Sequence, residues 1–232
     1  MIASSSNSEG ETSPLRTRWA RPSPSYFAYS AKPIVSSPES LWECCSVTGH
    51  GQRESVVKAY LAGPDVFLPD AIDVGRRKRE ACARSGIVGL FPLDNVLPKA
   101  ATPAAYARAI ALANEAMIRD CDVVLANLTP FRSPSADPGT AFEIGFARAV
   151  GKTIHGYSAA GDLLLPRTRR MLGLGKGAMH DNAGQAIEDF GMFDNLMLDS
   201  AILESGGVIV ARAADDLSAM AAFEDLLKRI SL

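Results

Sequence analysis

The chain has 232 residues, of which 47% are hydrophobic and 22% charged, and its formal net charge is −2. This composition is typical of a globular protein with one full core, and it gives no electrostatic case for nucleic acid or an anionic membrane as the main partner. No stretch approaches the roughly 20 consecutive apolar residues of a membrane helix. The four cysteines form no C-x-x-C pair, and the three histidines show no metal-ligand spacing. We therefore expect a reduced, cytoplasmic protein with no metal site and no cofactor.

The first 55 residues differ from the rest of the chain. They are dense in serine and proline, and the prolines would interrupt any regular element. We expect residues 1–55 to be a disordered or loosely attached leader and residues 56–232 to form one folded domain. Two alternatives stay open, a transit peptide and a domain whose true start lies near Val56.

From Val56 onward, short apolar runs alternate with segments of helical character. We expect strands at residues 56–62, 87–91, 123–126, 153–157 and 208–210. We expect helices at residues 71–85, 103–119, 193–204 and 216–230, and another after the loop that follows residue 126. Residues 159–181 are rich in Gly, Arg and Leu and carry no predicted element. This alternation predicts an α/β protein with a flavodoxin-like three-layer fold and a five-stranded parallel sheet.

The loop after the third predicted strand leads into a helix that carries two acidic residues, Asp137 and Glu143. In open α/β folds the carboxyl ends of the strands form the ligand-binding edge, so these carboxylates lie where a site is expected. Thr140 and Glu143 also stand in T-x-x-E spacing, which fits a capping box that only satisfies backbone donors at the helix start. The local pattern leaves both interpretations open.

The end of the first predicted strand faces the same edge of the sheet. Gly63 would let a ligand approach the backbone closely, Phe67 could stack on a flat ring, and Tyr60 could donate a hydrogen bond to a carboxylate. Taken alone, both aromatic residues also fit plain core positions. The G-x-G-x-x-G dinucleotide motif and the G-x-x-x-x-G-K-[ST] phosphate loop are both missing from the sequence.

Five motifs in chain order narrow the function. They are Tyr60-Leu61-Ala62-Gly63-Pro64, Pro92-Leu93-Asp94-Asn95, Ala126-Asn127-Leu128-Thr129-Pro130-Phe131, Ala136-Asp137-Pro138-Gly139-Thr140-Ala141-Phe142-Glu143-Ile144-Gly145 and Asp194-Asn195-Leu196-Met197. Together, and in this order, they resemble the nucleoside 2-deoxyribosyltransferase family. The resemblance runs from Val56 to the C-terminus, so residues 56–232 would be the catalytic domain.

The resemblance implies an enzyme that moves 2-deoxyribose from one nucleobase to another in nucleoside salvage. Its partners would be deoxynucleosides and free nucleobases. Glu143 matches the nucleophile, which forms a covalent glycosyl-enzyme intermediate, and Tyr60 matches the tyrosine that orients it. Two successive displacements at the anomeric carbon retain its configuration.

The same resemblance implies the substrate-binding residues. Asp137 matches the aspartate that holds the sugar 5′-hydroxyl, and its charge would repel a 5′-phosphate, which favours nucleosides over nucleotides. Asn195 and Met197 match residues that reach the sugar from a neighbouring subunit, which implies a homo-oligomer. The resemblance places Phe67, Asp65 and Asp94 on the base side, and Gly63 is the position at which the substrate could approach the backbone closely.

One position departs from part of the family. Asn114 aligns with an aspartate that some members carry, and an amide cannot act as a general acid. The proton for the leaving base would then come from Glu115, Asp65, Asp94 or water. Two other functions stay open: an N-glycosidase of deoxynucleosides or their 5′-monophosphates, in which water accepts the sugar, and a non-catalytic nucleotide-sensing module in which Glu143 is only a helix cap.

Overall fold

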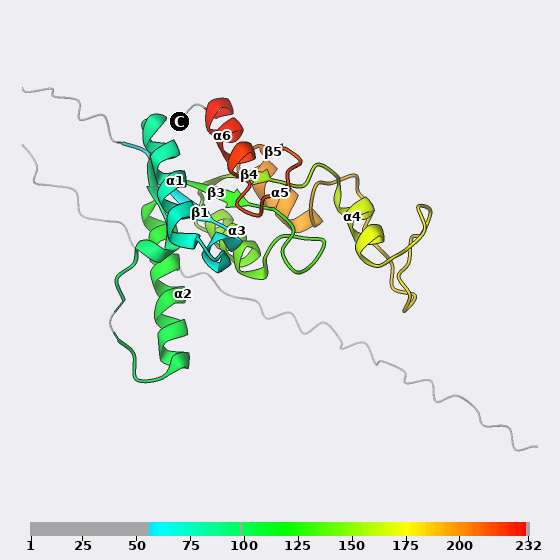
Figure 1. Cartoon of the computed structure of the whole chain (residues 1–232), viewed down its shortest axis with the longest axis horizontal. Coiled ribbons are helices and arrows are strands. Elements are labelled where there is room, and N and C mark those ends of the chain that lie inside the picture. Colours follow the sequence, from blue (N-terminus) through cyan, green and yellow to red (C-terminus); the bar gives the residue numbers. More distant parts are fainter. Residues whose placement is uncertain (1–55, 98, 231–232) are drawn as a thin grey trace, which may run out of the picture. The chain divides into compact units, whose positions relative to one another are not determined.

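The computed structural model describes residues 56–97 and 99–230 (Figure 1). The predicted leader, residues 1–55, lies outside the described residues.

Five strands form one parallel sheet in the order β2-β1-β3-β4-β5. They are β1 (Lys58–Ala62), β2 (Val88–Leu90), β3 (Val123–Asn127), β4 (Thr153–Ser158) and β5 (Ile209–Ala211). This strand order is that of flavodoxin-like folds, and it confirms the predicted five-stranded parallel sheet. The sheet order reverses direction at β1 and β3, and at such a switch point the loops that leave the strands separate and open a crevice.

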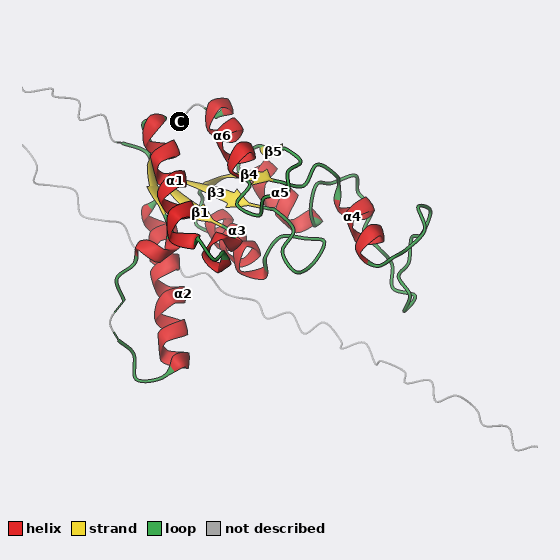
Figure 2. Ribbon diagram, viewed as in Figure 1, coloured by secondary structure: helices red, strands yellow, loops and turns green. Residues whose placement is uncertain are grey.

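Helices cover both faces of the sheet (Figure 2). On one face lie α1 (Ala71–Arg84) and α6 (Met220–Arg229), and on the other lie α2 (Pro103–Asp120), α3 (Pro138–Ala149) and α5 (Leu196–Glu204). The two 3-10 turns, η1 (Pro64–Phe67) and η2 (Pro92–Asp94), follow β1 and β2 directly.

The alternation of side chains along β1 decides which residue faces which layer. Ala59 and Leu61 belong to the core under α1 and α6, whereas Tyr60 and Ala62 belong to the core under α2 and α3. The strand therefore directs Tyr60 toward α3, the helix that carries Glu143.

The structure corrects the sequence-based prediction in three regions. A helix, α4 (Leu164–Met171), occupies part of residues 159–181, where none was predicted. The last helix begins at Met220 and not at residue 216, because Ala219 adopts a left-handed conformation with φ 49° and interrupts the helical backbone. The helix predicted from residue 193 begins at Leu196, after its N-cap Asn195.

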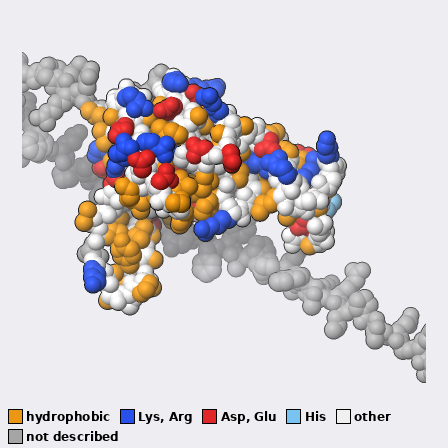
Figure 3. All heavy atoms as spheres, viewed as in Figure 1, with side chains coloured by type: hydrophobic (Ala, Val, Ile, Leu, Met, Phe, Trp, Pro, Cys, Tyr) orange, Lys and Arg blue, Asp and Glu red, His pale blue; other side chains and the backbone are white. Residues whose placement is uncertain are grey.

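The N-terminal part of α2 has little contact with the sheet. Ile118, near the C-terminal end, is buried, whereas Tyr106, Ile110 and Leu112 are exposed. Figure 3 shows hydrophobic side chains gathered on this projecting part of the molecule. Within residues 56–97 and 99–230, no helix has both the length and the apolar character needed to cross a membrane.

Candidate active site

Glu143 and Tyr60 meet between α3 and the first strand. The Tyr60 hydroxyl donates a hydrogen bond of 2.6 Å to Glu143 Oε1. Tyr60 is fully buried, whereas Glu143 is half-buried and lines a cavity. Among the described residues no second hydrogen bond to the Glu143 carboxylate is present, so its other oxygen is left for a ligand. The tyrosine thus fixes the carboxylate in one orientation at the cavity wall.

The start of α3 excludes the capping-box interpretation. Asp137 is the N-cap of the helix, and its Oδ2 accepts a hydrogen bond of 3.1 Å from the backbone N–H of Thr140. Thr140 is therefore the third helical residue rather than the cap. Glu143 lies in the second turn, where it satisfies no backbone donor of the helix start. Its side chain serves the contact with Tyr60 instead.

The electrostatic environment makes the Glu143 carboxylate unusually basic. Burial raises its pKa to about 7 from the ordinary 4.5, the Tyr60 hydrogen bond opposes that rise, and the nearby Asp137 charge adds to it. Burial and the Glu143 charge together raise the pKa of Tyr60, which keeps the phenol protonated and therefore a donor. A carboxylate of this basicity is a stronger nucleophile once it is ionised.

The cavity in front of Glu143 has a volume of about 450 Å³, within the range of small-molecule sites. Its wall comes from the turn after β1, the turn after β2, the α2 helix and the start of α3. The lining residues are Gly63, Val66, Phe67, Pro92, Leu93, Asn95, Leu97, Tyr106, Ile110, Asn114, Asp137, Gly139, Thr140 and Glu143. Most are apolar, with a few polar groups among them, as expected for a site that binds an organic ring and orients it.

Two polar atoms on this wall have no hydrogen-bond partner within the described part of the chain. Asn114 Oδ1 and Thr140 Oγ1 are buried and form no hydrogen bond to any other described residue. Buried polar atoms are almost always hydrogen-bonded, so these two are available for polar groups of a ligand.

The turn after β1 forms part of the cavity wall. Gly63 has φ 157°, and a Cβ atom there would lie 2.7 Å from Asn127 Cβ, so a larger residue would not fit. Phe67 stacks on Phe131 with ring centroids 5.3 Å apart, and the Arg132 guanidinium lies 5.5 Å from the Phe67 ring. Phe67 keeps 57% of its surface exposed, which leaves the ring accessible for stacking.

Two of the predicted base-side residues are engaged elsewhere. Asp65 is buried and forms an ion pair of 2.8 Å with the fully buried Lys78. Asp94 forms an ion pair with Arg79, and its Oδ2 accepts the backbone N–H of Phe91 at 3.2 Å. Neither carboxylate lines the cavity, so we leave both out of the candidate site.

Asn195 and Met197 are not brought to Glu143 within one chain. Asn195 caps α5, where its Oδ1 accepts the Met197 N–H at 3.0 Å and its Nδ2 donates to Glu188 Oε2 at 2.7 Å. Both residues line another, larger cavity of about 860 Å³, which touches α3 at Ala141 and other residues but does not include Glu143. That a neighbouring subunit supplies them stays a prediction.

Sequence reasoning named Asn114 on α2 only as a departure from the family pattern, and it missed Tyr106 and Ile110. Tyr106, Ile110 and Asn114 stand four residues apart, which places them on one face of the helix, and all three line the cavity. Their spacing predicts that they share one face of the helix, although it does not show that this face lies at the edge of the sheet. Across residues 56–97 and 99–230, no group of three or more Cys, His, Asp or Glu side chains is arranged to hold a metal ion.

Comparison with known proteins places this chain in a family. The family model for nucleoside 2-deoxyribosyltransferase matches residues 59–197. The chain belongs to the nucleoside 2-deoxyribosyltransferase family. The matched span includes Tyr60, Asp137 and Glu143, and it ends at Met197.

Two individual proteins extend this family match over most of the chain. A protein of Schizosaccharomyces pombe that is described only as uncharacterized is 32% identical over 199 residues, which cover 78% of this chain and 91% of the relative. The solved structure of 2-desoxiribosyltransferase from Leishmania mexicana is 30% identical, with a TM-score of 0.54 over 75% of this chain and 99% of that chain. The deoxyribosyltransferase fold is therefore shared over the same part of the sequence.

Proposed function

We propose that this family member moves 2-deoxyribose from one nucleobase to another through a covalent intermediate on Glu143, as a step of nucleoside salvage. The observation that carries the proposal is the 2.6 Å hydrogen bond from Tyr60 to a basic carboxylate on the wall of a nucleoside-sized cavity. An oriented carboxylate with one oxygen facing the cavity is what a displacement at a sugar carbon requires.

The reaction has two balanced steps. In the first, a Glu143 oxygen forms a bond to C1′ of the deoxyribose while the C1′–N glycosidic bond breaks, and the bonding pair leaves with the base. In the second, a ring nitrogen of the incoming base bonds to C1′ and releases its proton to solvent, the C1′–O bond breaks, and the Glu143 carboxylate is restored. Each step inverts C1′, so the sequence as a whole retains the β configuration.

Three neighbours would divide the work of holding the substrate. Tyr60 keeps the Glu143 carboxylate aligned through its hydrogen bond. Asp137, on the same wall, would accept the proton of the sugar 5′-hydroxyl in a hydrogen bond, and the exposed Phe67 ring would stack on the base.

The leaving base also needs a proton, and water is the source we propose. The Asn114 amide cannot supply one. Glu115 contacts Arg119 at 3.5 Å, and neither it nor Asp65 nor Asp94 lines the cavity. With the three carboxylic acids placed elsewhere, proton delivery falls to solvent that enters the cavity with the base.

A second candidate is an N-glycosidase of deoxynucleoside 5′-monophosphates. It is favoured by Arg132, an exposed guanidinium near Phe67 that forms no ion pair with any described carboxylate. Against it stands the rest of the loop, because the Ser135 hydroxyl donates to Asp194 and the Ser133 hydroxyl donates to the Ser135 carbonyl. Asp137 would in addition repel a phosphate, so we favour the nucleoside transferase.

The decisive experiment is incubation of the full chain with deoxyinosine and adenine, followed by chromatography of the products. We expect deoxyadenosine and hypoxanthine, and we expect Glu143→Gln to lose at least about 10³-fold in rate because it removes the nucleophile. Glu115→Gln is the matched control, since that residue lies outside the cavity, and it should retain activity.

The products also separate the alternatives. Free deoxyribose without deoxyadenosine would identify a hydrolase. A Glu143→Gln variant that folds normally and still transfers the sugar would show that the proposed mechanism is wrong. A mass increase of one 2-fluoro-2-deoxypentosyl group on a peptide containing Glu143, trapped with a 2-fluorinated deoxynucleoside, would identify the nucleophile directly.

A further inference from the structure

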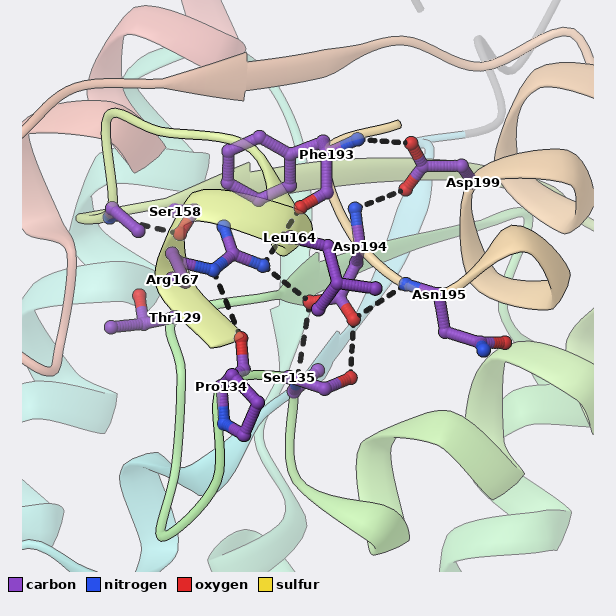
Figure 4. A network of polar contacts seen from close by, with 12 residues as sticks. Thr129, Pro134, Ser135, Ser158, Leu164, Arg167, Phe193, Asp194, Asn195 and Asp199 are labelled. Carbon is purple, nitrogen blue, oxygen red and sulfur yellow. Dashed lines mark hydrogen bonds and ion pairs between the residues drawn. The ribbon is translucent and has the colours of Figure 1, made fainter. Parts of the chain in front are cut away.

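Asp194 is the centre of a buried polar network at the loop that leads into α3 (Figure 4). Its Oδ2 accepts hydrogen bonds of 3.2 Å from the Ala136 backbone N–H and from Arg167 Nη2. Its Oδ1 accepts the Asn195 backbone N–H at 2.7 Å and the Ser135 hydroxyl. One fully buried carboxylate therefore joins two loops and a helix that are distant in the sequence.

Arg167, on α4, supplies the opposite charge and holds three backbone carbonyls. Its Nε donates to Pro134 O at 2.9 Å, its Nη1 to Asp162 O at 2.8 Å, and its Nη2 to Phe193 O at 2.7 Å. Only 2% of Arg167 is exposed. A buried guanidinium needs this many acceptors, and here all of them belong to the loops around Asp194.

Asp199, in the first turn of α5, fixes the backbone of the same segment. Its two carboxylate oxygens accept the N–H groups of Phe193 at 2.7 Å and of Asp194 at 3.0 Å (Figure 4). Asp199 thus fixes the backbone of Asp194, and the Asp194 side chain contacts residues 134–136 from that fixed position.

The network touches the residue directly before the sugar-binding carboxylate. Arg167 and Asp194 form hydrogen bonds to the segment from Pro134 to Ala136. The residue that follows this segment is Asp137, which is the N-cap of α3 and lines the Glu143 cavity. A shift of this backbone would move Asp137 first. Displacements of about 1 Å at a positioning group can cost about 10²-fold in an enzymatic rate.

We propose that Asp194, paired with Arg167, is a positioning residue that sets Asp137 for recognition of the substrate 5′-hydroxyl. The inference rests on the proposed function, in which Asp137 binds that hydroxyl. It assigns a role to the first residue of the Asp194-Asn195-Leu196-Met197 motif and to a helix that the sequence did not predict. Asp194 itself does not touch the substrate, because it is buried outside the Glu143 cavity.

The test compares two nucleosides that differ only at the 5′ carbon. Deoxyinosine and 2′,5′-dideoxyinosine are titrated by calorimetry into the full-length Glu143→Gln protein, with and without Asp194→Asn, so that binding is read without turnover. Asparagine keeps the shape of aspartate but presents an NH₂ group to N–H and O–H donors. We expect it to weaken deoxyinosine binding by about tenfold and the 5′-deoxy compound by much less.

Two further variants keep the test sharp. Ser135→Ala removes one hydrogen bond between Asp194 and the loop, and it should show the same selectivity with a smaller effect, even if Asp194→Asn does not fold. Thr168→Ala is the matched control, because that hydroxyl is adjacent to Arg167 in the sequence but bonds within α4 to Leu164 O at 2.9 Å. It should leave both affinities unchanged.

Equal weakening for the two nucleosides, or none for either, would overturn the positioning role. That result is separate from failure of the proposed function, which is decided by sugar transfer in the wild-type chain. Active transfer with an unselective Asp194→Asn effect would reject this inference alone. A Glu143→Gln parent that does not prefer deoxyinosine over the 5′-deoxy compound would reject it too, because no 5′-hydroxyl contact would then exist to position.

Discussion

At the scale of the residue, the burial that makes the proposed nucleophile Glu143 basic also destabilises the folded protein when the carboxylate is ionised. Its pKa in the folded protein is raised to about 7 from 4.5, mainly by burial. Between about pH 4.5 and about pH 7, Glu143 therefore stays protonated in the folded protein, whereas in the unfolded chain it has already lost its proton. It follows that the contribution of Glu143 to stability is lost as the pH rises from about 4.5 through about 7.

We expect Glu143→Gln to be more stable than the wild type above neutral pH, by on the order of 2 kcal/mol. Glutamine keeps an oxygen that can accept the Tyr60 hydroxyl but carries no charge to bury. Urea unfolding at about pH 5 and about pH 8 measures the difference, which should be small at the lower pH and grow at the higher. A stability difference that stays constant between the two would mean that the carboxylate ionises as freely in the fold as outside it.

Some residues of this site could be predicted from the sequence and others could not. Tyr60 stands near the end of the first predicted strand, and Asp137 and Glu143 follow the loop after the third, so all three were expected near the carboxyl edge of the sheet. Their roles came from the family resemblance, because each residue alone also fitted a structural role. The role of Thr140 could not be predicted, because T-x-x-E spacing does not show which residue starts the helix. Only the Asp137 contact to the Thr140 N–H distinguishes the two.

At the scale of the element, the strands and most helices were predictable from periodicity, whereas α4 was not. Its buried residue is an arginine, and the partners of that arginine include Pro134, Phe193 and Asp194, which lie 26 to 33 positions away in the sequence. A helix stabilised by such distant contacts leaves little local pattern. For the same reason the sequence did not predict that Asp65 forms an ion pair with Lys78, which lies on the following helix.

Lys78 anchors α1 to the turn that carries Gly63 and Phe67. Its Nζ donates to Asp65 Oδ1 and to the Tyr157 hydroxyl, each at 2.8 Å, and the side chain is fully buried. We expect Lys78→Met to lower the free energy of unfolding by about 3–5 kcal/mol, because it leaves the Asp65 carboxylate buried without its cation.

Urea unfolding of three variants would test this anchor. Lys78→Met combined with Asp65→Asn should recover part of the loss, since no uncompensated charge then remains. Lys58→Met, which breaks an exposed ion pair with Asp120, is the control and should change stability little. If the double variant were less stable than Lys78→Met alone, hydrogen bonding of Asp65 to Asn127 would outweigh the buried charge.

At the scale of the whole molecule, one chain supplies only part of the site that the family resemblance implies. The cavity holds Glu143, Asp137 and Phe67, while Asn195 and Met197 line another cavity. The exposed apolar part of α2 borders the Glu143 cavity through Tyr106 and Ile110, and burial against a second copy would remove this surface from water. Hydrophobic periodicity shows which face of a helix is apolar, but it does not show whether that face packs against the same chain or against a second subunit.

Mixed oligomers would show whether Asn195 acts on a neighbouring site. Glu143→Gln lacks the nucleophile, and Asn195→Ser lacks the longer side chain but keeps an oxygen that can cap α5. If Asn195 acts across the interface, a hybrid pairs the intact Glu143 of one chain with the intact Asn195 of the other. For dimers formed at random from equal amounts, one complete site in each hybrid predicts about a quarter of wild-type activity.

Deoxyinosine-to-adenine transfer by the co-expressed chains, measured against each variant alone, gives the answer. Recovery well above the average of the two single variants requires that the two residues come from different chains. Activity equal to that average would place Asn195 in the site of its own chain, where only a movement of the segment around α5 could bring it to Glu143. The Asp194 network argues against such a movement, because it bonds the Asn195 backbone to the loop that starts α3.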